Sequence, residues 1–108
     1  MFDGFVRERF IVFWLSSSNQ VLGFEVISEG LLNSSLVHPR EVFRGSIVAT
    51  SANIILAHNH PSGNLDPSSE DIATTNKLVE AGKIIDIAVF DHIIFGDGYT
   101  SMIEKGLM

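Results

Sequence analysis

The sequence contains no cysteine, and this absence excludes two kinds of structure. Without cysteine the chain can form neither disulfide bonds nor metal sites built from thiolates. The zinc deaminases, whose metal site uses cysteine ligands, are excluded for the same reason. A chain without cysteine fits a reducing cytoplasm, which is the compartment that we expect for it.

Basic residues are scarce as well. Seven Lys and Arg stand against 13 Asp and Glu, which gives a formal net charge of −6. Proteins that hold duplex DNA through its phosphates usually cluster their basic side chains, whereas here these residues are scattered along the chain. We therefore expect no tight nonspecific binding of DNA by this chain alone.

Long apolar runs are also missing. No run approaches the roughly 18 residues that a membrane-spanning helix needs. The first residues, Met1 to Gly4, carry neither the basic region nor the apolar region of a secretion signal, so we expect neither export nor membrane insertion. With 108 residues and 45% apolar content, the chain suits one domain, residues 1–108, with a single core.

The apolar patterns predict an α/β fold, a sandwich in which a mixed β-sheet is flanked by helices. The expected elements, in order, are strands over 5–15, 21–28 and 31–37, a helix beginning at Pro39, a strand from Asn53 to Ala57, a helix that follows Ser68 and stops at Gly82, and strands within 84–95 and over 99–101. The first two strands are expected to pair as an antiparallel hairpin. The face of the first helix is expected to carry four apolar residues, Val42, Phe43, Ile47 and Val48.

The most informative stretch runs from His58 to Asp71. Alternate side chains of a strand point to the same face, so His58 and His60 converge on one point if the strand persists through His60. Ser68 follows a proline and precedes a helical pattern, which makes it a natural N-cap and places Asp71 at N3 in the first turn. Two histidines, one carboxylate and a free position for water are the composition of a catalytic zinc site.

Each part of this stretch also has a simpler interpretation. In Ser-x-x-Asp before an apolar helix, Asp71 can return a hydrogen bond to the cap without binding metal, and for an isolated match this capping box is the interpretation to prefer. His-x-His alone is equally unspecific. The conjunction of both pairs around a Pro-Ser-Gly turn is what favours a metal site.

The spacing resembles a known motif. His58-x-His60, seven intervening residues, Ser68, two more and Asp71 is similar to the JAMM motif of the JAB/MPN metallopeptidases, and the wording His-Asn-His-Pro-Ser-Gly resembles the RadC branch of that family. The resemblance covers the chain from about Arg7 to its end. It implies a JAB/MPN, cytidine-deaminase-like architecture, Zn²⁺ held by His58, His60 and Asp71, and hydrolysis of peptide or isopeptide bonds in a peptide or protein substrate.

The resemblance also implies two catalytic side chains. The general base is a glutamate far upstream of the histidines, for which the candidates are Glu8, Glu25 and Glu41. Glu41 is explained by the dipole of the first helix, and Glu25 most simply faces solvent. By itself, Glu8 is equally well explained as a hydrated charge between two arginines, and the resemblance favours it as the base that deprotonates water. Ser68 is implied to donate a hydrogen bond to the oxyanion, which its role as a cap leaves possible.

Two further polar residues rank lower. His92 can support the site, although a strand histidine satisfied by a neighbouring carboxylate is the interpretation to prefer. Asn59, on the opposite parity from the ligands, is expected to pin the loop through its amide.

Two other functions stay open. Some MPN relatives are noncatalytic interaction modules, but those typically lack the ligands that this chain keeps. RadC-like proteins were traditionally described as DNA repair factors, and an accessory of that kind would show salt-sensitive binding to nucleic acid. Longer members carry an N-terminal helical region that is missing here, so we expect either a short form or an excised domain.

Overall fold

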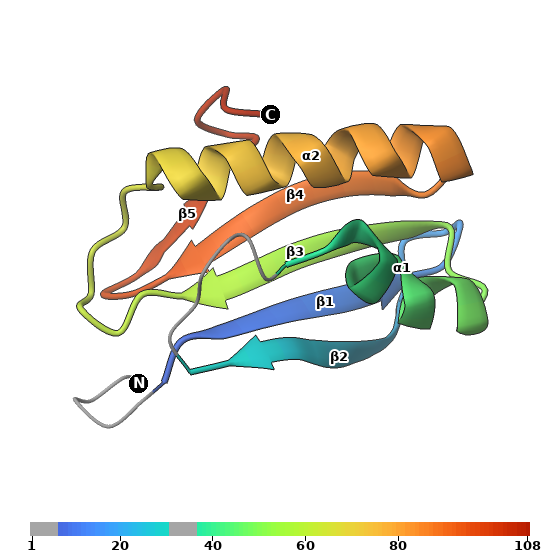
Figure 1. Cartoon of the computed structure of the whole chain (residues 1–108), viewed down its shortest axis with the longest axis horizontal. Coiled ribbons are helices and arrows are strands. Elements are labelled where there is room, and N and C mark those ends of the chain that lie inside the picture. Colours follow the sequence, from blue (N-terminus) through green and yellow to red (C-terminus); the bar gives the residue numbers. More distant parts are fainter. Residues whose placement is uncertain (1–6, 31–36) are drawn as a thin grey trace.

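The computed structural model describes residues 7–30 and 37–108, and Figure 1 shows their arrangement. The elements in chain order are β1 (Arg9–Leu15), β2 (Val21–Glu29), α1 (Pro39–Val48), β3 (Asn53–Asn59), α2 (Ser69–Ile85), β4 (Ala88–Phe95) and β5 (Tyr99–Ser101). The strand predicted over residues 31–37 lies outside the described residues except for Val37, which belongs to no helix or strand.

The five strands form one mixed sheet in the order β2-β1-β3-β4-β5. β1 pairs antiparallel with both β2 and β3, β3 pairs parallel with β4, and β5 returns antiparallel to β4. Parallel neighbours need a long crossover connection, and α2 provides it between β3 and β4. The predicted α/β fold with a mixed sheet and flanking helices is therefore confirmed, as is the antiparallel hairpin of β1 and β2.

Both described helices pack on the same face of the sheet, and the core lies between them and the strands (Figure 1). This core consists of buried apolar side chains from the helices, the central strands and their connections: Phe10, Val12, Val37, Val42, Phe43, Ile54, Leu56, Leu78 and Ile87. His58 is paired with Phe10 across β1 and β3, and its ring stacks on that phenyl ring. The candidate site therefore lies at the border of the apolar core.

The structure leaves the apolar face of β2 exposed. Leu22, Phe24 and Val26 are 50%, 60% and 42% exposed. Glu25, which was expected to face solvent, instead points under α1, where its Oε1 would lie 2.5 Å from a Cβ added at Gly45. The connections through α1 and α2 place both helices on one face, and at this edge strand the covered face is the one opposite to the apolar residues.

Helix α1 buries a narrower face than its sequence suggested. Val42, Phe43 and Ser46 are buried, whereas Ile47 and Val48 are 60% and 81% exposed. The last turn of the helix therefore leaves the core, so the expectation that Ile47 and Val48 share the buried face was wrong.

Helix α2 also ends later than expected. It continues through Gly82 to Ile85 and stops at Asp86, which has a left-handed backbone, so residues 84 and 85 are helical rather than part of a strand. Gly82 is not a terminating residue but a point of close approach, because a Cβ there would lie 2.2 Å from the carbonyl oxygen of Ile87. No helix in residues 7–30 and 37–108 combines the length and the hydropathy needed to cross a bilayer.

Candidate metal centre

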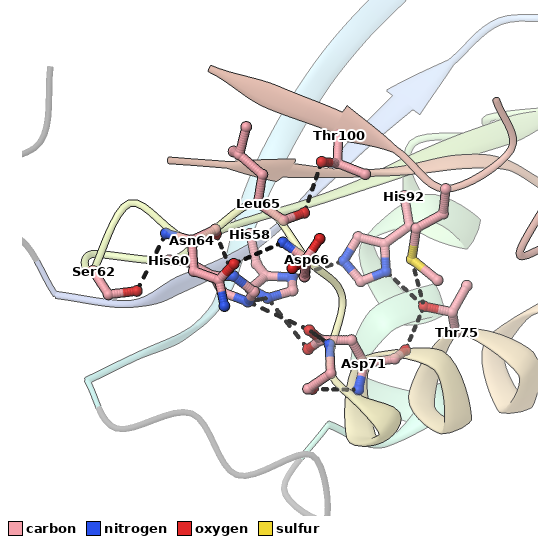
Figure 2. Close-up of polar contacts among 12 residues, drawn as sticks. His58, His60, Ser62, Asn64, Leu65, Asp66, Asp71, Thr75, His92 and Thr100 are labelled. Atoms are coloured by element: carbon pink, nitrogen blue, oxygen red, sulfur yellow. Dashed lines mark hydrogen bonds and ion pairs between the residues drawn. The ribbon is translucent and has the colours of Figure 1, made fainter. Parts of the chain in front are cut away.

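His58 and His60 point to the same side at the carboxyl end of β3 (Figure 2). The strand ends at Asn59, but the backbone N–H of His60 still donates to the carbonyl of Phe95 in β4 at 2.7 Å, so extended geometry continues to His60. As a result the two Nε2 atoms lie 2.9 Å apart. The strand periodicity thus brings both imidazoles to one point.

Asp71 reaches the same point from the first turn of α2. Its Oδ1 lies 3.3 Å from Nε2 of His58, and its Oδ2 lies 3.3 Å from Nε2 of His60. Asp71 also completes a capping box with Ser68: its backbone N–H donates to the serine hydroxyl at 3.0 Å, and its Oδ2 accepts from the serine N–H at 2.8 Å. The capping box and the convergence on the histidines are therefore compatible, since one carboxylate does both.

The loop between His60 and Ser68 fixes the orientation of the second imidazole. Nδ1 of His60 lies 2.8 Å from the carbonyl oxygen of Asn64, and because a carbonyl only accepts, this nitrogen carries the proton. In the neutral ring the Nε2 of His60 therefore offers a lone pair. The far side of the loop is held by Thr100, whose hydroxyl donates to the carbonyl of Leu65 at 2.7 Å.

The three side chains fit a metal ion. His58, His60 and Asp71 each offer one ligand atom, and these atoms all lie within 4.8 Å of one another. Ligand atoms at ~2.0–2.1 Å from a tetrahedral zinc ion are separated by roughly 3.3 Å. The 2.9 Å and 3.3 Å separations found here are close to that spacing. Two imidazole nitrogens and a carboxylate are also the donor set that zinc prefers in the absence of thiolates.

The electrostatic environment keeps the buried histidines neutral. Burial lowers the pKa of His58 to about 4, with the negative Asp71 opposing the shift and His60 adding to it. Burial also lowers the pKa of His92 to about 3, reinforced by the neighbouring His58. A metal ligand must offer an unprotonated nitrogen, so these shifts favour coordination at neutral pH.

Glu8 and Ser68, the two predicted catalytic residues, line the same cleft as the three ligands. This cleft has a volume of about 240 Å³. Continuing the pairing of Phe10 with His58 by two residues would place Glu8 opposite His60, on the side of the sheet that carries the ligands. By contrast, Glu25 lies under α1, and Glu41 is exposed in α1 beside Arg40, 4.0 Å away.

Asn59 fixes the segment that contains Glu8 rather than the loop after the histidines. Its side-chain oxygen accepts from the backbone N–H of Arg9 at 2.7 Å, and its side-chain nitrogen donates to the carbonyl of Arg7 at 3.0 Å. These two bonds bracket Glu8 on both sides. Asn59 is itself buried, so the strand that carries His58 also positions the start of β1.

His92 contacts the site directly, contrary to the preferred interpretation of the sequence. Its Nε2 lies 2.8 Å from Nδ1 of His58, and its Nδ1 lies 2.6 Å from the hydroxyl of Thr75 in α2 (Figure 2). The neighbouring carboxylate, Asp91, accepts from the backbone N–H of His92 and not from its ring. Thr75 was missed altogether, although its position four residues after Asp71 places both on one face of α2.

Comparison with known proteins agrees with this geometry. A family model described as RadC-like JAB domain matches residues 1–107. A UPF0758 protein of Methanosarcina mazei is 52% identical over 103 residues, which cover 94% of this chain and 45% of that protein. UPF0758 proteins of Moorella thermoacetica and Staphylococcus carnosus are 56% identical over 103 residues and 54% identical over 101 residues. These two matches cover 94% and 93% of this chain and 45% of each relative.

The chain thus spans less than half the length of the curated relatives that it matches. The match nevertheless includes nearly every residue of this chain, among them the two histidines and the aspartate that converge at the end of β3. On these grounds the chain belongs to the RadC-like JAB domain family.

Proposed function

We propose that this domain is a zinc-dependent hydrolase of the JAMM type that cleaves peptide or isopeptide bonds. The observation that carries the proposal is the convergence of His58, His60 and Asp71 within 4.8 Å, in a cleft that Glu8 and Ser68 also line. When bound, a zinc ion would supply a Lewis acid that polarises a carbonyl and makes water easier to deprotonate.

In this proposal the side chains of the cleft divide the remaining work. Glu8 accepts a proton from the attacking water and returns it to the leaving amine, which is the task of a general base followed by a general acid. The hydroxyl of Ser68 already accepts from the N–H of Asp71 at 3.0 Å, so its own proton is available to stabilise an oxyanion. The bonds from Asn59 to Arg7 and Arg9 support the role of Glu8 because they fix its backbone on both sides.

The competing proposal is a noncatalytic interaction module. A role as an accessory in DNA repair is a further alternative. A module needs no metal ligands, whereas this domain buries His58 with its Nε2 3.3 Å from a carboxylate oxygen of Asp71. Burying such polar groups costs free energy unless they are well paired, which favours a site with a function over a docking surface alone.

The first test is metal content, measured by elemental analysis on protein purified without a polyhistidine tag. We expect about one zinc per chain in the wild type, which three protein ligands permit, and loss of that zinc in His58→Ala. The second test is incubation of the zinc-loaded protein with a mixture of peptides and of isopeptide-linked lysine peptides. We expect new termini by mass spectrometry, with Glu8→Gln as the inactive, metal-binding control.

The outcomes separate the proposals. Wild-type protein that takes up no zinc on addition would remove the hydrolase proposal and leave the interaction module. Protein that binds zinc through His58 but cleaves neither kind of peptide would confine the proposal to a structural metal site.

A further inference from the structure

A chain of three hydrogen bonds runs from one metal ligand back to another. Nδ1 of His58 lies 2.8 Å from Nε2 of His92, Nδ1 of His92 lies 2.6 Å from the hydroxyl of Thr75, and that hydroxyl donates to the backbone carbonyl of Asp71 at 2.7 Å (Figure 2). The chain therefore begins at a ligand on β3, passes through β4 and ends at a ligand on α2.

The donor and acceptor of each hydrogen bond follow from the group at the end of the chain, the carbonyl of Asp71. The carbonyl of Asp71 can only accept, so Thr75 uses its single proton there. The Thr75 oxygen must then accept from His92, which places the His92 proton on Nδ1 and leaves a lone pair on its Nε2. That lone pair accepts from His58, so the proton of His58 is on Nδ1 and its Nε2 is unprotonated.

We propose that Thr75 and His92 are positioning residues that hold His58 in its Nδ1–H tautomer, so that its Nε2 lone pair faces His60 and Asp71. The inference rests on the proposed metal site but not on hydrolysis. Both act through His58, because His92 contacts its ring directly and Thr75 contacts the ring of His92.

The alternative arrangement shows why this control is needed. Nε2 of His58 lies 2.9 Å from Nε2 of His60 and 3.3 Å from Oδ1 of Asp71, so a proton on that nitrogen would be donated to one of these two groups. Either hydrogen bond would occupy ligand atoms that a cation needs. The bond from His58 to His92 opposes this arrangement. A neutral ring carries one proton, and His92 keeps that proton on Nδ1 of His58 by accepting it.

The Nδ1–H tautomer of His60 is fixed by a single hydrogen bond. Its Nδ1 is held by the carbonyl of Asn64 in the adjoining loop at 2.8 Å, whereas the partner of Nδ1 of His58 among the described residues is the ring of His92. His58 and His92 are both almost fully buried, with 2% and 1% exposure, so water has little access to replace either partner. The tautomer of His58 therefore depends on Thr75, two hydrogen bonds away.

The test reads the tautomers directly. In metal-free protein at neutral pH, long-range ¹⁵N–¹H correlation spectra of the imidazole rings distinguish Nδ1–H from Nε2–H. We expect Nδ1–H for His58 and His92 in the wild type. In Thr75→Val the ring of His92 loses its acceptor, so we expect its proton to move to Nε2 and the proton of His58 to move to Nε2 as well.

Zinc affinity gives the second readout. We expect Thr75→Val to weaken zinc binding by roughly 10–100-fold, the size of effect typical of residues that orient a metal ligand. Thr75→Ser keeps the hydroxyl and should restore both the tautomers and the affinity. Ser46→Ala is the matched control, because it removes a buried hydroxyl in α1 whose hydrogen-bond partner among the described residues is Ser51, outside the site.

The results that overturn the inference are specific. A proton on Nε2 of His58 in the wild type would contradict the inference. The proposal can therefore be tested even if Thr75→Val does not fold. An unchanged tautomer and affinity in folded Thr75→Val would contradict it as well. If the tautomers behave as expected but no variant binds zinc, the hydrogen-bond chain stands and the proposed metal function fails.

Discussion

Two groups of polar side chains with buried polar atoms lie on the same face of the sheet, one under each helix, and they differ in how they are connected. Under α2, His58, His92 and Thr75 form a continuous chain of hydrogen bonds that ends on Asp71. Under α1, Trp14 and Glu25 are neighbours around Gly45, yet neither Nε1 of Trp14 nor Oε1 of Glu25 has a hydrogen-bond partner among the described residues.

The difference shows that a partly buried carboxylate does not by itself indicate a site. Glu25 has its other oxygen 3.7 Å from the guanidinium of Arg44, an ion pair that is mostly exposed on the arginine side and worth little. Asp71 instead meets two unprotonated nitrogens and returns a hydrogen bond to the cap of its own helix. What distinguishes the candidate site is that its hydrogen bonds have defined donors and acceptors. They leave the Nε2 lone pairs of His58 and His60 facing Asp71.

We expect the largest effect in a comparison of hydrolysis by the variants Glu8→Gln and Glu25→Gln. We expect Glu8→Gln to lower hydrolysis by ~10²–10⁴-fold with zinc content unchanged, because an amide cannot accept the proton of water as a general base does. The measurement is turnover of a cleaved peptide together with elemental analysis. Glu25→Gln is the control and should leave both unchanged. Equal losses in the two variants would contradict the assignment of Glu8.

The second effect concerns acid stability, to which the two buried histidines of the α2 group contribute. The pKa values of His58 and His92 are lowered to about 4 and about 3, below the value of 6.5 expected in the unfolded chain. Their contribution to stability is therefore complete above about pH 6.5 and is lost as the pH falls towards these folded-state values. We expect the metal-free protein to lose about 2 kcal/mol per ring between about pH 7 and about pH 5.

Urea unfolding in the presence of a chelator measures this loss. His92→Gln removes one of the two titrating rings and should reduce the acid-dependent part by about half, since two rings contribute. A free energy of unfolding that does not change over this pH range would show that neither ring is held neutral in the fold.

The smallest effect tests the packing under α1. Alanine normally favours a helix over glycine by up to about 1 kcal/mol, but a Cβ at Gly45 would lie 2.7 Å from Cζ2 of Trp14. We expect Gly45→Ala to lower the free energy of unfolding by about 1–3 kcal/mol, the usual range for overpacking, and to leave zinc binding unchanged. Val48→Ala, at an exposed position of the same helix, is the control. A more stable Gly45→Ala would mean that the indole moves aside freely.

Local patterns predicted the parts of the site that are close in sequence. A two-residue period brings His58 and His60 to one face, and a helix start three residues before Asp71 explains the capping box with Ser68. The element types were also largely predictable, because apolar spacing and turn residues are local signals.

The errors have a common cause in contacts between distant segments. Glu25 was expected to face solvent, but the position of α1, rather than the apolar parity of the strand, decides which side of this edge strand is covered. Gly82 was taken for the end of α2, although it is a contact with the backbone of Ile87. His92 was assigned to a neighbouring carboxylate because its true partners, His58 and Thr75, lie 34 and 17 residues away.

The sequence by itself determined which atoms can bind a metal, since the ligand types, their spacing and the start of α2 are all local properties. The tertiary structure decided which of those atoms carry protons. That choice depends on pairing β3 with β4 and on packing α2 over both, because only then do His58, His92 and Thr75 come within hydrogen-bonding distance. A tautomer is set by the partner of the opposite ring nitrogen, and for His58 that partner is supplied by the fold.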